Sequence, residues 1–204
     1  LPLVIALHGK ESNGPAFLWS MMKQAASRGF ALLAPSSLGY SWGAPPPKWA
    51  LPDPKRPSVN ADVDNILSIL DEIEQRLPID ASRTLLLGFC EGAPFALQLA
   101  MQAKASERPA DRNRFAGIAM VASGLTDVEA LPALPEGMRI YWLHGMLDAL
   151  TPIQMVRKQA KDLVDSQDRK VRATARAAEL ERERRAEERR AEARAAMEAD
   201  AKDK

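Results

Sequence analysis

Apolar residues in the first 168 positions form short continuous runs, which alternate with longer stretches that have helical spacing. Short continuous runs are typical of strands that are buried on both faces of a sheet. They predict strands at residues 3–7, 31–34, 84–87, 115–121 and 139–143. Helices are predicted at residues 17–28, 59–76 and 91–103, and the second of these has a clear apolar face. This alternation predicts an α/β fold with a mainly parallel sheet.

The composition changes near residue 168. Residues 169–204 contain 12 Lys and Arg and nine Asp and Glu, together with 11 alanines, and they lack Gly, Pro and aromatic residues. Ala, Arg and Glu favour helices, and opposite charges fall at helical neighbours, as in the pair Glu181/Arg185. We therefore expect an α/β domain at residues 1–168 and a charged helical tail at 169–204, which continues a helix that begins near residue 152.

Three larger apolar residues in the tail are too few for the seam of a coiled coil. We therefore expect a solvated helix, and the alternative is an arm that binds a partner or RNA.

Composition excludes several classes of protein. A net charge of +1 gives no indication of a nucleic-acid or anionic-membrane partner. One cysteine and two histidines exclude a disulfide framework and a His-rich metal site. No apolar run approaches the roughly 20 residues that a membrane span needs. The chain has no signal peptide and no initiator methionine, which favours a cytoplasmic location and a start inside a larger or processed gene product.

One predicted strand runs directly into a Gly-x-Cys-x-Gly turn and then a helix, at residues 84–103. This is the context of a nucleophile elbow, with Cys90 where serine is usual. A sharp turn needs glycine at Gly88 and Gly92, and it holds the side chain between them above the sheet. The helix start favours a thiolate there, and the N–H of Glu91 is placed to bind a developing oxyanion. The alternative is a small buried cysteine between two packing glycines.

Four segments in this order carry a resemblance to a known family. They are Leu-His-Gly at residues 7–9, Arg-Gly-Phe-Ala-Leu-Leu-Ala-Pro at 28–35, Ile-Asp-Ala-Ser-Arg at 79–83 leading to the elbow, and His-Gly-Met-Leu-Asp at 144–148 followed by Thr-Pro. Over about residues 3–165 the chain resembles small esterases of the α/β-hydrolase superfamily. These include carboxylesterase/phospholipase-like esterases, polyhydroxybutyrate-depolymerase-like esterases and dienelactone hydrolases, which also have cysteine at the elbow.

This resemblance implies a three-layer α/β sandwich with strand order 2-1-3-4-5. It also implies hydrolysis of small carboxylic esters through an acyl-enzyme, without a metal or organic cofactor. Cys90 is then the nucleophile, and Asp148 is the acid that orients a catalytic histidine. The backbone N–H groups of Lys10 and Glu91 form the oxyanion hole. Alternatively, Asp148 is an ordinary loop carboxylate.

The resemblance is incomplete at the C-terminal end. The family has a further strand and a catalytic histidine after the acid, whereas this chain has no histidine after His144 and continues as the charged helix. Three explanations remain open: a non-catalytic descendant, a C-terminus altered by a frameshift or partial reading frame, or an enzyme whose base comes from another subunit or from His144. We expect impaired ester hydrolysis, with a binding or scaffold protein as the alternative. The sheet edge left without a neighbour would favour self-association, as would the helix.

A long loop at residues 36–58 holds several aromatic residues among prolines. We expect Trp42 and Trp49 to line an apolar acyl or aryl pocket at the same end of the sheet as Cys90. The alternative is that these tryptophans simply pack against the sheet.

Overall fold

The computed structural model describes residues 1–39, 41–42, 59–125 and 127–202. The chain forms two compact units, Leu1–Asp162 and Leu163–Lys204. The domain boundary predicted near residue 168 is a few residues C-terminal to the boundary between these two units. The predicted domain division stays a prediction.

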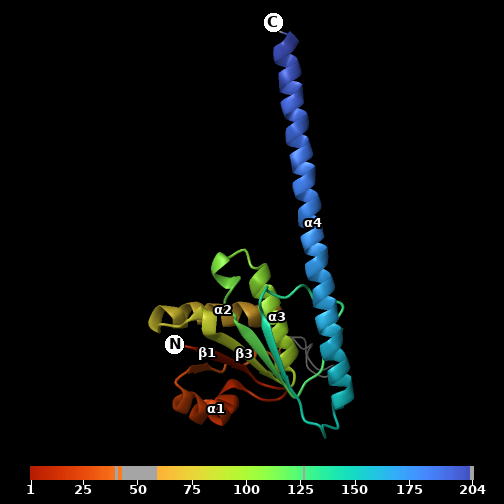
Figure 1. Ribbon diagram of the computed structural model, residues 1–204. Helices are drawn as coiled ribbons and strands as arrows, with labels where there is room; N and C mark the ends of the chain where they lie inside the picture. Colours follow the sequence, from red (N-terminus) through yellow and green to blue (C-terminus); the bar gives the residue numbers. More distant parts are fainter. Residues whose placement is uncertain (40, 43–58, 126, 203–204) are drawn as a thin grey trace, which may run out of the picture. The chain divides into compact units, whose positions relative to one another are not determined.

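The first unit contains a five-stranded sheet, shown in Figure 1. Its strands are β1 (Leu3–Leu7), β2 (Ala31–Leu33), β3 (Thr84–Phe89), β4 (Gly117–Val121) and β5 (Arg139–Leu143). Every neighbouring pair is parallel, and the order β2-β1-β3-β4-β5 is the predicted one. Strand β3 is two residues longer than predicted, because Gly88 and Phe89 pair with Met120 and Val121 of β4.

Three helices of this unit are α1 (Gly14–Arg28), α2 (Val59–Arg76) and α3 (Gly92–Ala105), and single 3-10 turns lie at Ala81–Arg83 and Pro109–Asp111. Helix α1 begins three residues before the predicted start. The side chain of Asn13 accepts a hydrogen bond from the N–H of Ala16 and caps the helix, and Pro15 suits its first turn. Helix α3 begins one residue later than predicted, which leaves Glu91 in the turn before it.

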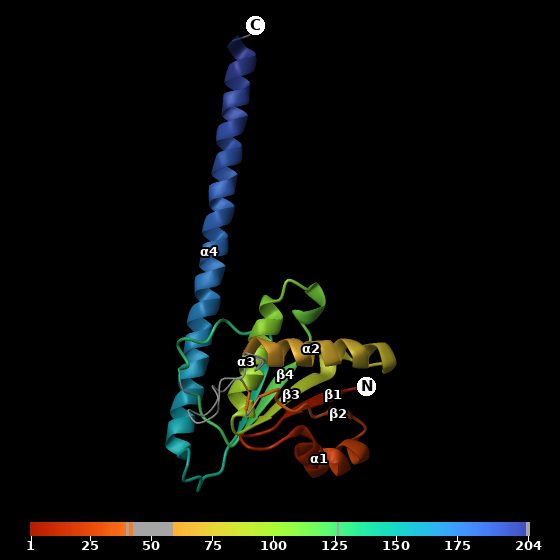
Figure 2. The same cartoon turned by 180° about the vertical axis from the view of Figure 1, so that it is seen from behind.

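The helices cover the sheet in two layers. Helix α1 lies on one face, and α2 and α3 lie on the other (Figures 1 and 2). The resulting three-layer α/β sandwich confirms the predicted fold class. Its core contains large, fully buried side chains from β1, β3, β4 and the two helices on one face, among them Ile5, Leu86, Met120, Leu70 and Leu97.

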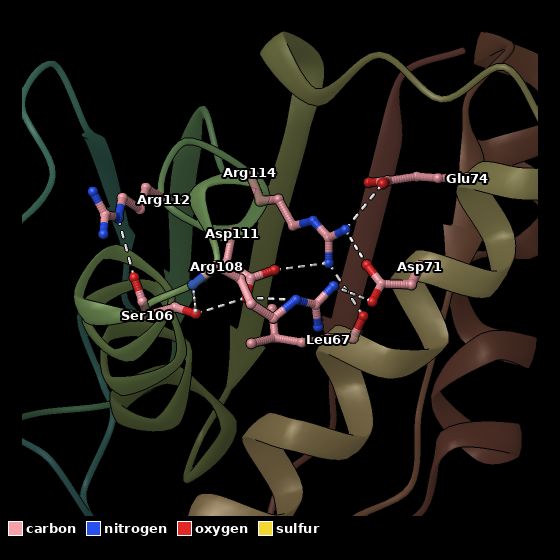
Figure 3. Close-up of polar contacts among 8 residues, drawn as sticks. All are labelled: Leu67, Asp71, Glu74, Ser106, Arg108, Asp111, Arg112 and Arg114. Carbon is pink, nitrogen blue, oxygen red and sulfur yellow. Dashed lines mark hydrogen bonds and ion pairs between the residues drawn. The ribbon is translucent and has the colours of Figure 1, made fainter.

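A cluster of charged side chains joins α2 to the segment before β4 (Figure 3). Its central residue is Arg114, whose side chain is only 5% exposed. The guanidinium donates to the carbonyl oxygen of Leu67 and to Glu74 of α2, each at 3.1 Å, and also to Asp71. The hydrogen bond from Arg114 is the main cause of a lowered pKa of Asp71, and a second bond from Arg108 adds to it.

Asp111 is the most deeply buried charged residue of this cluster. Its side chain is 1% exposed and accepts a hydrogen bond from the hydroxyl of Ser106 at 2.8 Å. The other carboxylate oxygen has no hydrogen bond among the described residues, but it lies 3.3 Å from a guanidinium nitrogen of Arg114. Arg108 lies 3.7 Å from the first oxygen, and a carboxylate buried in this way depends on such cations.

Helix α4 (Ile153–Lys202) is continuous through 50 residues, which confirms the predicted long C-terminal helix. Residues 171–180 are all exposed, as expected of a solvated helix. Glu181 lies 2.8 Å from Arg184 and 2.7 Å from Arg185. The hydrogen bonds from Arg184 and then Arg185 lower the pKa of Glu181 to about 2. Exposed pairs of this kind contribute little to stability.

Two further findings concern the described part of the chain. None of its helices is long and apolar enough to cross a membrane. It also contains no group of three or more His, Cys, Asp or Glu side chains that could hold a metal ion.

Candidate active site

The turn between β3 and α3 has the backbone geometry of a nucleophile elbow. Cys90 has φ +52°, in the left-handed region that residues other than glycine seldom adopt. Its N–H donates to the carbonyl oxygen of Val121 at 2.9 Å, and its own carbonyl accepts from Ala93 at 3.1 Å. These bonds from β4 and α3 hold a strained residue at the carboxyl end of a central strand. Strain of this kind is common at functional sites.

The two glycines of the motif allow this turn to pack closely. A Cβ atom on Gly88 would lie 2.2 Å from the carbonyl oxygen of Gly92, and one on Gly92 would lie 2.3 Å from that of Leu7. Helix α3 therefore begins directly against the backbone of β1. Both interpretations of Cys90, a nucleophile and an inert buried cysteine, predict closely packed glycines. The packing is therefore consistent with either interpretation.

Cys90 is partly exposed and lines a cavity of about 310 Å³. The other lining residues come from the turn after β1, from α1 and from the end of β3: Gly9, Lys10, Ser12, Ala16, Phe17, Ser20 and Phe89. The rings of Phe17 and Phe89 are 6.2 Å apart between centroids and tilted by 42°. A cavity of this volume lies at the small end of the range for small-molecule sites.

Sequence reasoning missed Phe17 and Phe89. Phe89 lies inside the Gly-x-Cys-x-Gly motif, directly before Cys90. Its position was a usable signal, because it places Phe89 beside the nucleophile at the carboxyl end of the strand. Phe17 gave no comparable signal, since its place in the cavity depends on how α1 packs against the sheet.

The two residues predicted to form the oxyanion hole also lie at the carboxyl ends of the strands. Lys10 follows β1 and lines the cavity, and Glu91 follows Cys90 immediately before α3. The turns approach closely, since a Cβ atom on Gly9 would lie 3.1 Å from the Cβ of Cys90. The first N–H groups of a helix have no acceptor within the helix, which suits a developing anion. The structure thus brings Lys10, Cys90 and Glu91 together, and the oxyanion role of the two amides stays a prediction.

Trp42 lies in the interior instead of lining this cavity. It is 7% exposed, its ring stacks on Phe95 of α3 at 4.7 Å, and its indole N–H donates to the carbonyl oxygen of His8 at 2.7 Å. This placement agrees with the alternative in which the tryptophan packs against the fold. A substrate contact by Trp42 stays a prediction, and Trp49 lies outside the described residues. The neighbouring Ser41 is buried and donates its hydroxyl hydrogen to the Glu91 carboxylate.

His8 is a structural residue with both ring nitrogens engaged. It is 1% exposed, its Nε2 accepts from the N–H of Ser37 at 3.1 Å, and its Nδ1 lies 2.7 Å from the carbonyl oxygen of Gly9. Since Nε2 accepts, the ring hydrogen is assigned to Nδ1. This arrangement ties the start of the 36–58 loop to the turn that carries Lys10.

His144 and Asp148 form a second local pair, in the turn after β5. Nε2 of His144 lies 2.6 Å from the carbonyl oxygen of Thr151 and 3.5 Å from a carboxylate oxygen of Asp148. The other carboxylate oxygen accepts from the N–H groups of Leu150 and Thr151, each at 2.9 Å. The Thr151 N–H is the main cause of a lowered pKa of Asp148, with the Leu150 N–H and nearby His144 adding to it.

Both this pair and Cys90 lie at the carboxyl ends of the strands. They are two strands apart, which is about 10 Å at the usual strand spacing. Within the described part of the chain, no hydrogen bond joins either histidine to Cys90. The nucleophile candidate is therefore present without an imidazole base beside it.

Comparisons with known proteins find esterases similar to this chain. No protein-family model matches the chain. It is 30% identical over 153 residues to the protein named "Putative esterase NocK" from Nocardia uniformis subsp. tsuyamanensis, a match that covers 74% of this chain. The chain spans about two fifths of the length of that relative, since the match covers 41% of it.

Solved structures of esterases share the fold. A Bacillus cereus carboxylesterase matches with a TM-score of 0.57 and 16% identity, over 81% of this chain and 74% of its own. A phospholipase/carboxylesterase from Dyadobacter fermentans matches with a TM-score of 0.55 and 20% identity, over 81% and 76%. Esterase PE8 matches with a TM-score of 0.53 and 20% identity, over 80% and 77%.

Proposed function

We propose that this chain, which has the α/β-hydrolase fold and resembles esterases of that fold, cleaves small carboxylic esters through a thioester on Cys90. The observation that carries this proposal is the left-handed backbone of Cys90 at the carboxyl end of β3. Strained backbone of this kind is common at functional sites, and a cavity of small-molecule size lies beside Cys90. The esterases with the same fold add support from similarity.

The chemistry proceeds in two steps. The thiolate of Cys90 attacks the ester carbonyl carbon, and the oxyanion that forms is bound by the N–H groups of Lys10 and Glu91. Collapse of this intermediate breaks the bond to the alcohol oxygen, and the alkoxide takes a proton from water and leaves hydroxide. Hydroxide then attacks the thioester carbon and breaks the carbon–sulfur bond, which releases the carboxylic acid and restores the thiolate.

The second step is expected to be slow. His8 is bonded to Ser37 and Gly9, and His144 lies against Thr151 and Asp148, so neither is beside Cys90 to activate water. Loss of one member of a catalytic triad typically removes most of the rate and leaves the contribution of the oxyanion hole and binding. A thiol retains some reactivity without a base, whereas a serine hydroxyl does not.

The placement of the histidines also favours a second candidate function. A scaffold that has lost its base can still bind a small molecule in the cavity beside Cys90 without cleaving it. The proposal and this alternative differ in whether Cys90 becomes acylated.

The test is the release of nitrophenolate from 4-nitrophenyl acetate by the wild-type chain, Cys90→Ala and Cys90→Ser, with intact mass measured in parallel. We expect a burst of about one equivalent and a mass increase of one acetyl group in the wild type, followed by slow turnover. Both signals should be absent from Cys90→Ala and reduced at least about tenfold in Cys90→Ser. Equal release by the wild type and Cys90→Ala, without acylation, would support the binding protein instead.

We also propose self-association through β5. This strand ends the described sheet, and its side chains Tyr141 and Leu143 are 52% and 54% exposed. An edge strand with apolar side chains can pair with the same strand of a second copy, because both copies offer the same backbone donors and acceptors.

Sedimentation velocity of the wild type and Tyr141→Lys tests this second proposal. The wild type should contain a dimer that Tyr141→Lys removes, because a charge on an edge strand opposes pairing. Trp19→Lys is the matched control, since Trp19 is 75% exposed but lies on α1. A monomeric wild type, or equal loss of dimer in both variants, would show that β5 is not the interface.

A further inference from the structure

We propose that Phe17 and Phe89 make the cavity beside Cys90 selective for esters of compact aromatic acids. This inference rests on the proposed acylation of Cys90 and specifies which acyl group the site takes. It adds two phenylalanines to the aromatic residues, Trp42 and Trp49, that the sequence predicted for the pocket.

The positions of the two rings support this assignment. Phe89 is the last residue of β3 and precedes the nucleophile, while Phe17 lies in the first turns of α1 on the same side of the sheet. Phe89 is 42% exposed although it belongs to a central strand. A large apolar side chain exposed at that place, beside a reactive group, is available for a ligand to cover.

The geometry between the rings favours a flat partner. Their centroids are 6.2 Å apart, their planes are tilted by 42°, and both residues line the cavity. A third aromatic ring can meet both of them in offset or tilted contacts with centroid separations of roughly 4.5–7 Å. A linear alkyl chain gains area burial from these rings but not the ring–ring contact.

The volume and the remaining lining residues are compatible with an aromatic acyl group. The cavity of about 310 Å³ accommodates a benzoyl group, and the preference over an alkyl chain of similar size comes from the rings. Gly9 and Ala16 add little bulk to the lining, since glycine has no side chain and alanine ends at Cβ. The hydroxyl of Ser20 already donates to the carbonyl oxygen of Phe17 at 2.7 Å, so it presents only acceptor capacity to a ligand.

The experiment compares the rates at which trifluoroethyl acetate, benzoate and octanoate acylate Cys90, followed by intact mass. All three share one leaving group without a ring, so only the acyl group varies. Each rate is divided by the rate with a small free thiol, which removes the intrinsic reactivity of the ester. We expect the normalised rate for benzoate to exceed those for acetate and octanoate by about tenfold, and each of Phe17→Leu and Phe89→Leu to reduce that preference about three- to tenfold.

Trp19→Leu is the control, because Trp19 is on α1, is 75% exposed and does not line the cavity. Its acyl preference should equal that of the wild type, and its acetate rate should change by less than about twofold. Acylation by all three esters without a preference for benzoate, or with a preference that survives both substitutions, overturns this inference and leaves the proposed function standing.

If no ester acylates Cys90, the proposed function fails and the pocket is tested on its own. Benzoate is then titrated into the wild type and Phe17→Leu, with chemical shifts as the readout. Weaker binding by the variant supports the aromatic pocket as a binding site, and absence of binding by the wild type overturns it.

Discussion

Replacing Gly92 by alanine is expected to destabilise the chain by about 3 kcal/mol or more and to stop the acylation of Cys90. A Cβ atom at this position would lie 2.3 Å from the carbonyl oxygen of Leu7 and 2.7 Å from that of His8. Both are backbone atoms of β1 and the turn after it, and β1 is paired on both sides, with β2 and β3. Neither neighbour can move aside as a flexible side chain would, so α3 has to shift away from the sheet.

That shift would alter the site directly. The N–H of Glu91 and the carbonyl of Cys90 belong to the turn that α3 pulls with it, and the turn after β1 carries Lys10. The gain in helix propensity from Gly to Ala, about 1 kcal/mol, offsets only part of the cost.

Urea unfolding and the acetylation assay check this prediction, with Gly39→Ala as the matched control. A Cβ atom on Gly39 would meet nothing closer than 3.8 Å, so the same substitution there should change stability by less than about 0.5 kcal/mol. If Gly92→Ala is as stable as the control, the backbone of β1 can shift to make room for the added Cβ atom, and the prediction is wrong.

The sheet was predictable because its strands are short apolar runs, which match the buried strands β1 and β4, whereas Tyr141 and Leu143 of β5 are exposed. Several predicted element boundaries were wrong. The end of β3 was placed too early, because pairing with β4 extends the strand beyond the residues that favour it. Gly88 favours a strand poorly by itself, yet it is paired with Met120 of β4 and continues β3. At α1 the local signal was present, since Asn13 and Pro15 mark a helix start, but the apolar spacing placed that start three residues later.

The candidate site was predictable in its backbone and less so in its side chains. The glycines around Cys90 specify a tight turn from sequence alone. Which aromatic residues face the cavity depends on packing: Trp42 is turned inward by its bond to the His8 carbonyl, and Phe17 faces Phe89 because α1 lies across that face. Sequence also shows how few histidines there are, but only the contacts of His8 and His144 show that both are engaged elsewhere.

Replacing Arg114 by methionine is expected to cost about 3 kcal/mol of stability at pH 7, because it removes the nearer cation of the buried Asp111 carboxylate and leaves the exposed Arg108 at 3.7 Å. Asp111 is 1% exposed, and one of its oxygens depends on the 3.3 Å contact with Arg114. The same substitution removes the Arg114 bonds to Asp71 and Glu74, so α2 keeps the bond from Arg108 to Asp71 but loses part of its polar connection to the segment before β4 (Figure 3). The length of the methionine side chain preserves most of the apolar packing, so the loss is mainly electrostatic.

The pH dependence of the stability loss in Arg114→Met shows whether the loss is electrostatic. Arg114 and Arg108 lower the pKa of Asp71 in the folded chain, so this stabilisation is complete above the pKa of the unfolded carboxyl, about 3.9. It is lost as the pH falls through the lower folded value, because protonated Asp71 no longer gains from the guanidinium. The difference in unfolding free energy between the wild type and Arg114→Met should therefore be large at pH 7 and smaller at pH 3.

Arg112→Met separates this effect from the loss of a surface charge. Arg112 donates to the carbonyl oxygen of Ser106 at 3.1 Å from an exposed position, so its replacement should cost less than about 1 kcal/mol. Adding Asp111→Asn to Arg114→Met should recover part of the lost stability, since the amide does not bring an uncompensated charge into the interior. Urea unfolding of the three variants at both pH values decides the matter. A cost for Arg114→Met that is the same at pH 3 and pH 7 would point to packing of the arginine stem as the stabilising contact.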